Sequence, residues 1–144
     1  MELLIQQLKV ILGTNFVLYL KAHNYHWNIE GANFPQYHSF LDNFYNSVWA
    51  QTDTIAEHIR ALDAYVPGSL IRFLELSAIE DATTVPDAHT MFITLKNDND
   101  RFIIQLRAGI VVAEQAGEPA VSNFLQDLLD THQKHAWMLR SIIK

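Results

Sequence analysis

Five side chains of the types that commonly bind metal ions lie in one short stretch of this chain: His26, His38, Asp42, Asp53 and Glu57. His38 and Asp42 are four residues apart. Asp53 and Glu57 have the same spacing, so in a helix each pair lies one turn apart on the same side. Two imidazoles and three carboxylates form a borderline-to-hard ligand set, which suits iron, manganese or zinc better than copper(I) or calcium. The types and spacing therefore indicate a metal site.

The two pairs cannot bind the same ion within one helix. Asp42 and Asp53 are separated by about 16 Å of helical rise, whereas metal–ligand bonds are about 2 Å long. Either the pairs bind different ions, or a second copy of the helix supplies the missing half. If two antiparallel copies cross near Ser47 and Val48, each His38 pair lies beside the acidic pair of the other chain. Two identical sites would then form at a dimer interface.

The alternative without metal binding is that these acids and histidines form a solvated helix face or an ion-pair network. His26 precedes the other four and belongs to an earlier helix. The turn from Gly31 to Pro35 could fold it back beside His38 and Asp42. Two neighbours of His26, namely His23 and Trp27, are placed to orient the imidazole ligands.

The apolar residues recur at helical spacing and predict four long helices with no strand. The first runs from near Glu2 to about Asn28. A short helix is expected within 69–76, inside a long connection between the second and third long helices. The second long helix is predicted to begin at Pro35 and to run for about thirty residues, because no helix breaker appears before Pro67-Gly68. The third is predicted from its cap Asp87 to about Gln115, where Gly117 ends it. The fourth is predicted from Pro119 to the C-terminus. This pattern predicts an all-α, four-helix bundle in which residues 1–144 form one domain.

Composition narrows the function classes further. The chain has 144 residues, of which 49% are hydrophobic, and a formal net charge of −6 with scattered basic residues. Direct nucleic-acid binding is therefore disfavoured. Cysteine is absent, which excludes disulfides and thiolate metal sites. With no basic n-region at the N-terminus and no uninterrupted apolar stretch of about 18 residues, we expect a cytoplasmic protein without a membrane span.

A family resemblance adds to this interpretation. The run from His26 to Phe34 resembles the signature of the Dps family, the starvation-induced miniferritins of the ferritin-like superfamily, as do the later residues His38, Asp42, Tyr45, Asp53 and Glu57. The resemblance covers the whole chain in helix order. In that family two imidazoles and an aspartate of one subunit meet an aspartate and a glutamate of its two-fold mate. All five positions match here by residue type.

The resemblance implies a hollow shell of twelve subunits with metal sites at two-fold dimer interfaces. Such a shell binds iron(II), oxidises it with hydrogen peroxide in preference to dioxygen, and stores the ferric product, which protects against oxidative damage. Trp27 resembles a family tryptophan that passes an electron, although core packing is an equally good role for it. Acids near the start of the last helix, here Asp127, Asp130 and Glu118, are expected at a three-fold iron-entry pore or as ordinary exposed acids. Asn123 occupies a nearby position that is often acidic in the family.

Several alternatives remain open from sequence. A ferritin with its di-iron centre inside each bundle needs Glu-x-x-His pairs, and the chain has none. A non-catalytic helical shell or a DNA-condensing protein is the main rival. The family's lysine-rich tail is missing, because helical periodicity starts almost at Met1 and ends at Lys144, so no strong DNA binding is expected. A zinc-dependent hydrolase is weaker, because its ligands should be reachable within one chain. The remaining residues of note are expected on the surface or core edge (His58, His89, His132 and His135) or in packing (Trp49 and Trp137).

Overall fold

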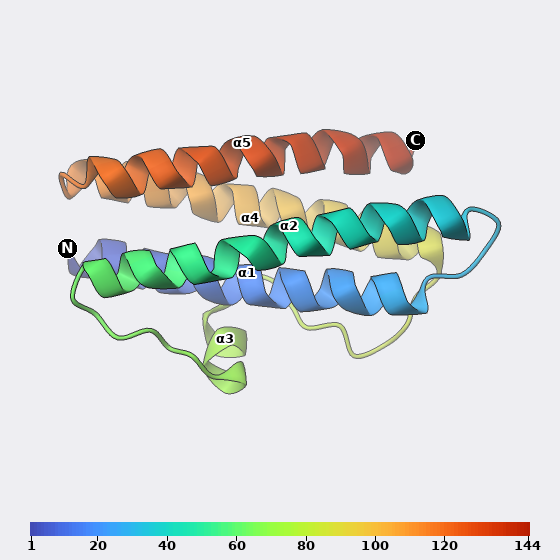
Figure 1. Cartoon of the computed structure of the whole chain (residues 1–144), viewed down its shortest axis with the longest axis horizontal. Helices are drawn as coiled ribbons and strands as arrows, with labels where there is room; N and C mark the ends of the chain where they lie inside the picture. Colours follow the sequence, from blue (N-terminus) through green and yellow to red (C-terminus); the bar gives the residue numbers. More distant parts are fainter.

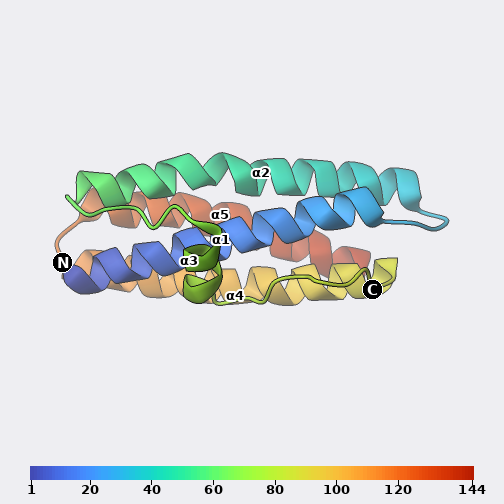
Figure 2. The same ribbon diagram turned by 90° about the horizontal axis from the view of Figure 1, so that it is seen from below.

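The computed structural model describes all 144 residues and contains five helices and no strand. Four long helices lie side by side as a bundle, and the short helix lies outside it (Figures 1 and 2). The predicted all-α, four-helix bundle with an extra short helix is confirmed. The helices are α1 (Glu2–Asn28), α2 (Phe34–Ala61), α3 (Leu70–Leu76), α4 (Ala88–Gln115) and α5 (Pro119–Ile142).

A long connection links the second and third helices of the bundle. Because α2 and α4 run in the same direction, residues 62–87 must return along the length of the bundle, and α3 lies near the middle of this segment (Figure 1). The pairs α1–α2 and α4–α5 are antiparallel and joined by short turns. One crossover of this kind is typical of ferritin-like bundles and distinguishes them from simple up-and-down bundles.

The end of α4 shows the helix-stop chemistry that the sequence predicts. Gly117 has a φ of 72°, in the left-handed region that glycine adopts without steric cost. The Glu118 N–H donates to the Ala113 carbonyl at 2.9 Å, and the Gly117 N–H donates to the Glu114 carbonyl at 3.1 Å. These two hydrogen bonds define a Schellman motif. They satisfy carbonyls that the end of the helix would otherwise leave unpaired.

The same motif ends α2 at a residue that sequence reasoning passed over. The helix has 28 residues, close to the expected thirty, but it ends at Ala61, well before the breaker Pro67-Gly68. Asp63 has a φ of 60°, and the Ala64 N–H donates to the Ile59 carbonyl at 3.3 Å. Aspartate is one of the few residues other than glycine that adopts this conformation. No glycine stands here to signal the stop.

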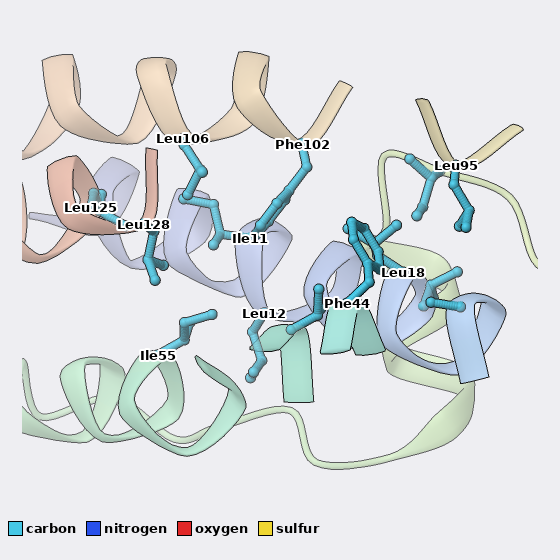
Figure 3. Packing of buried hydrophobic residues seen from close by; sticks show 14 of the residues in the cluster. Ile11, Leu12, Leu18, Phe44, Ile55, Leu95, Phe102, Leu106, Leu125 and Leu128 are labelled. Atoms are coloured by element: carbon cyan, nitrogen blue, oxygen red, sulfur yellow. The ribbon is translucent and has the colours of Figure 1, made fainter. Parts of the chain in front are cut away.

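The core lies between the four long helices, and each of them contributes large apolar side chains to it (Figure 3). Leu18, Phe44, Phe102 and Leu125, one from each helix, are at most 1% exposed. Burial of each such side chain stabilises the fold by roughly 1.5–3 kcal/mol. α1 is also long and apolar enough to cross a membrane, but 56% of its most apolar window is buried inside the bundle. Its place in the core accounts for that composition.

A buried ion pair joins α1 to α4 within this core. The Lys21 Nζ lies 2.7 Å from the Asp98 Oδ2, and both side chains are less than 10% exposed. Burial raises the pKa of Asp98, while the hydrogen bond and charge of Lys21 oppose that rise. Removal of either partner would leave a charge buried without compensation, which is the costly case for such pairs. The ion pair therefore fixes how α1 and α4 face each other.

Two histidines of α5 are in the core, so the surface or core-edge position expected for them is wrong. His132 is 0% exposed and His135 is 7% exposed. The Asn99 side-chain amide donates to the His132 carbonyl at 2.9 Å, which turns the Asn99 Oδ1 toward the His132 Nδ1 at 2.7 Å. The Gln51 side chain lies 3.0 Å from the His132 Nε2. This network connects α2, α4 and α5 at the middle of the bundle.

α3 is held against α1 at a glycine. A Cβ atom built on Gly13 would lie 2.8 Å from the Phe73 carbonyl oxygen and 3.0 Å from the Leu76 Cβ. The Thr14 hydroxyl accepts a hydrogen bond from the Ala78 N–H at 2.9 Å, directly after α3. The absence of a side chain at Gly13 therefore allows the close approach of α3.

We predict that Gly13→Ala destabilises the protein by roughly 1–3 kcal/mol, although alanine normally favours a helix, because the new methyl overlaps backbone that cannot move aside. Hydrogen exchange of the amides of α3 should accelerate. Gly68→Ala is the matched control, since nothing lies within 4 Å of its Cβ position. Unchanged exchange of α3 in Gly13→Ala would contradict the packing role of this glycine.

The buried histidines predict a specific acid sensitivity. Burial lowers the pKa of His135 from 6.5 to about 4. Since the unfolded chain binds this proton first, stability should fall as the pH drops from 6.5 to about 4, by on the order of 3 kcal/mol for this residue. In His135→Gln, the loss of Tm between pH 7 and 4.5, measured at fixed subunit concentration, should be smaller than in the wild type. The exposed His89→Gln is the control, and equal losses in wild type and His135→Gln would exclude this role.

Candidate metal centre

The structure brings His26 and His38 together in one arrangement. Their rings stack with centroids 3.8 Å apart and 16° between the planes. The His26 Nδ1 lies 3.0 Å from the His38 carbonyl oxygen, and the His38 Nδ1 lies 2.8 Å from the His26 carbonyl oxygen. A carbonyl only accepts, so each Nδ1 must be the protonated nitrogen that donates. In the neutral rings each Nε2 therefore keeps a free lone pair, as a metal ligand requires.

This reciprocal contact follows from where the two helices end and begin. His26 lies in the last turn of α1, where backbone carbonyls have no partner within the helix. His38 lies in the early part of α2, after Pro35 has opened the helix. The turn through Gly31, whose φ is 119°, reverses the chain between them. The expected return of His26 to the side of His38 is observed.

Asp42 lies one turn after His38 and is half-buried. Burial, and then the proximity of the Asp42 carboxylate to the Tyr45 hydroxyl, raise the pKa of Tyr45. The Asn46 amide donates to the Asp42 carbonyl oxygen at 2.9 Å. Asp42 therefore lies at the end of α2 that also carries His38.

The second pair, Asp53 and Glu57, lies further along α2 on its exposed side. The two carboxyl groups are close enough that Asp53 raises the pKa of Glu57, first by accepting a hydrogen bond from the protonated Glu57 and then through its negative charge. Two acids at this distance repel each other when both are ionised. A bound cation would relieve that repulsion, so the pair has the electrostatic character of half a metal site.

No three histidine, aspartate or glutamate side chains of one chain come together so that they could hold a metal ion. His26, His38 and Asp42 lie toward one end of α2, whereas Asp53 and Glu57 lie toward the other. We call these the histidine half-site and the acidic half-site. Each is incomplete within the chain, as the helical rise between them requires.

Exposed apolar side chains lie on α2, one turn before Asp53, and on α3. Near the proposed crossing point, Val48 is fully buried, so Trp49, which is 50% exposed, is the outward-facing residue. Leu70, Ile71 and Leu74 of α3 are 48–70% exposed. Trp49 and Trp137 were expected as packing residues, but both are at least half exposed in the single chain. Phe16 of α1 lies between the exposed groups on α2 and α3, with its ring 6.5 Å from that of Trp49 and 4.8 Å from that of Phe73 on α3. An exposed apolar surface of this kind marks an interaction surface.

An aromatic cluster adjoins the histidine half-site, and the sequence analysis found only part of it. His23 stacks on Tyr45 with ring centroids 3.8 Å apart and lies 4.0 Å from the ring of Trp27. The Tyr19 hydroxyl lies 2.9 Å from the His23 Nδ1. Burial, and then the nearby His26, lower the pKa of His23, while Asp42 opposes this shift. Tyr19 was missed, although its four-residue spacing from His23 on α1 was a usable signal.

The three acids expected at a pore are separated in the chain. Glu118 precedes α5 and lines a surface hollow of about 490 Å³ at the α4–α5 turn, together with Glu114 and Asn123. Asp127 and Asp130 are exposed on α5 and do not line this hollow. A pore would need several subunits, so the assignment of these acids stays a prediction.

Comparisons with known proteins agree with this fold. The model of the ferritin-like domain matches residues 5–144. The DNA protection during starvation protein of Brevibacillus brevis is 30% identical, and the match covers 100% of both chains. The crystal structure of antigen TpF1 from Treponema pallidum has a TM-score of 0.95 at 33% identity and covers 99% of this chain and 92% of that one. A Dps protein from Vibrio cholerae O1, described as a member of a broad superfamily of ferritin-like diiron-carboxylate proteins, has a TM-score of 0.95 at 26% identity, over 99% of this chain and 90% of that one.

Each of these proteins is similar to this chain over nearly the whole bundle, including the crossover with α3. The chain therefore belongs to the ferritin-like proteins and, within them, to the Dps family.

The hydrogen bonds of the histidine half-site predict the tautomer of both imidazoles. Nitrogen-15 chemical shifts of histidine-labelled protein, measured without metal at a pH where the rings are neutral, should show Nδ1 protonated and Nε2 unprotonated in His26 and His38. Exposed His89, which has no such partner, should show the mixture typical of free histidine. An Nε2–H form in either His26 or His38 would contradict the arrangement described here.

Proposed function

We propose that this protein oxidises iron(II), with hydrogen peroxide as the preferred oxidant, and stores the ferric product in a homo-oligomeric shell. His26, His38 and Asp42 of one chain and Asp53 and Glu57 of a two-fold mate would hold the iron. The observation that carries the proposal is the division of this ligand set into two half-sites that one chain cannot join. Membership of the Dps family supports it, as does the printed description of the Vibrio cholerae relative as diiron-carboxylate.

The donor set fits iron(II). Two imidazole Nε2 atoms and three carboxylates offer nitrogen and oxygen ligands of intermediate hardness, and the absence of cysteine leaves no thiolate to favour softer metals. The backbone carbonyls that fix both imidazoles do so before the metal arrives, so little reorganisation is needed on binding. The mutual repulsion of Asp53 and Glu57 favours a cation beside them.

The chemistry asked of these residues is to bind and orient the substrate iron. Hydrogen peroxide takes up two electrons and two protons to form two water molecules, and each iron(II) gives one electron. Protein ligands that do not fill the coordination sphere leave a position for the oxidant. The ligands of this site carry three carboxylate charges, which stabilise the iron(III) product over iron(II).

A second copy of the chain is the proposed occupant of the exposed apolar patch around Trp49 and α3. Trp49 lies one turn before Asp53 on α2, so a partner that covered it would also be placed to bring its own histidine half-site. An apolar cover would exclude water from the metal as well. By resemblance we expect a dodecamer assembled from such dimers, built from residues 1–144 as one domain and located in the cytoplasm.

The name of the Brevibacillus brevis relative refers to protection of DNA. For this chain we infer that protection operates through removal of iron(II) and peroxide rather than through a DNA-binding surface. Its net charge is −6, and its ten lysines and arginines are not clustered, so it lacks the basic surface that neutralises phosphates.

The division of the site predicts complementation between two inactive variants. His26→Ala/His38→Ala lacks the histidine half-site, and Asp53→Ala/Glu57→Ala lacks the acidic half-site, so each homo-oligomer should lose peroxide-dependent iron(II) oxidation. Co-assembly at equal amounts should restore about a quarter of the wild-type activity, since half of the dimers are mixed and one of their two sites is complete.

Native mass measurements and circular dichroism should first show that each variant assembles and folds like the wild type. Mixing without disassembly, which keeps each shell homogeneous, is the control and should restore nothing. The proposal fails if co-assembled shells remain inactive while the wild type oxidises iron(II), or if either double variant alone retains full activity.

A further inference from the structure

A run of aromatic rings connects the histidine half-site to a hydrogen-bonded tyrosine. The Tyr45 ring lies 5.1 Å from the His26 ring, centroid to centroid, and stacks on His23 at 3.8 Å. The next member, Tyr19, lies 6.2 Å from Tyr45, and its hydroxyl is 2.9 Å from the His23 Nδ1. Each ring in this run is in or near contact with the next.

We propose that Tyr19 is a redox-active residue that gives one electron to the iron site and, at the same time, its hydroxyl proton to the Nδ1 of His23. The inference rests on the proposed function and adds to it a source of electrons within the protein. The proposed electron transfer occurs in a turnover in which a complete site, formed by the histidine half-site of one chain and the acidic half-site of another, has bound only one iron(II).

In that turnover the bound iron(II) supplies one electron fewer than the reduction of hydrogen peroxide to water requires, so the protein must supply the second. Hydrogen peroxide needs two electrons to form water, and a single iron(II) supplies one, which would leave a hydroxyl radical. With Tyr19 as the second donor, iron(II), hydrogen peroxide, the tyrosine, neutral His23 and two protons from solvent give iron(III), a neutral tyrosyl radical, protonated His23 and two water molecules. The two solvent protons go to the peroxide, and the proton that Tyr19 releases is held by His23. A later iron(II) and a proton return the radical to tyrosine.

The proton acceptor distinguishes Tyr19 from the other aromatic residues near the site. Oxidation of a phenol is easiest when its proton can move to a base along an existing hydrogen bond. The Tyr19 hydroxyl has no protein partner except His23, and it can donate to the Nδ1 in the neutral tautomer of His23 that carries its proton on Nε2. The hydroxyl of Tyr45 instead faces Asp42, whose negative charge would already be engaged by the metal.

The surroundings of Tyr19 would also protect a radical on its ring from reaction with solvent. Its ring is half-buried on α1 and is packed between Phe16, at 5.8 Å, and Trp49, at 4.9 Å. In the proposed dimer the apolar patch that includes Trp49 would be covered, which would keep Tyr19 away from solvent. Trp27, by contrast, is 61% exposed and has no hydrogen-bond partner for its indole nitrogen.

The test uses the assembled protein loaded without oxygen with one iron(II) per proposed site, mixed with one equivalent of hydrogen peroxide and frozen rapidly. Electron paramagnetic resonance of the wild type should show a tyrosyl signal that narrows when the protein contains ring-deuterated tyrosine. Tyr19→Phe should lose most of this signal and should instead release hydroxyl radical, measured as increased spin-trap adduct.

Two further variants separate the redox role from a structural one. His23→Gln can still accept the hydrogen bond through its amide oxygen but cannot take the proton, so it should lose the tyrosyl signal as Tyr19→Phe does. Tyr37→Phe is the matched control, because Tyr37 packs on Phe92 away from this run of rings and should leave the signal unchanged.

The outcomes distinguish this inference from the proposed function. If the wild type oxidises iron(II) but forms no protein radical, or if Tyr19→Phe keeps the full tyrosyl signal, the redox role of Tyr19 is wrong while the iron chemistry stands. If the wild type does not oxidise iron(II) with peroxide, the proposed function itself has failed. Retention of the signal in His23→Gln would contradict the transfer of the proton to His23.

Discussion

The rise of an α-helix is the constraint on which the functional interpretation of this protein depends. The histidine and acidic half-sites share one rigid helix, and about 16 Å of rise separates Asp42 from Asp53. No change of side-chain conformation can close that distance, because the side chains involved are only a few bonds long. The geometry within one chain can therefore be complete in every local detail, as the reciprocal hydrogen bonds of His26 and His38 show, and the site can still lack ligands.

The core explains how α2 can keep these half-sites in place. Asn15 of α1 donates to the Val48 carbonyl and to the Thr52 hydroxyl, and Gln51 reaches His132 in the centre of the bundle. These buried polar contacts are satisfied in only one register of the helices, whereas apolar contacts tolerate small shifts. The middle of α2 is thereby fixed against the other helices. The two half-sites extend from this fixed segment toward opposite ends, so their separation and orientation are set by the fold.

Much of the fold was predictable from sequence because its signals are local. Pro35, Asp87 and Gly117 mark helix boundaries through their own backbone chemistry, and four-residue spacing pointed to the candidate ligand pairs. The end of α2 was not predictable in the same way, because Asp63 adopts a conformation that the sequence gives no reason to prefer there. Contacts between distant residues were also beyond local reasoning. His132 lies on the apolar face of α5, but the partners that satisfy its ring nitrogens are 33 and 81 residues away, so the neighbouring sequence does not identify them.

The position of the aromatic cluster gives the interface a second role in the proposed chemistry. The rings of Tyr45, Tyr19 and Trp49 follow one another from the histidine half-site to the exposed face that a second copy would cover. Assembly would thus complete the ligand set and shield the rings that adjoin it in the same step. An unassembled chain would have neither, so it could not bind iron tightly, and it would expose its oxidisable rings to solvent. Because both requirements are met by one contact, oxidation of iron would be confined to assembled shells, where the ferric product has a place to be stored.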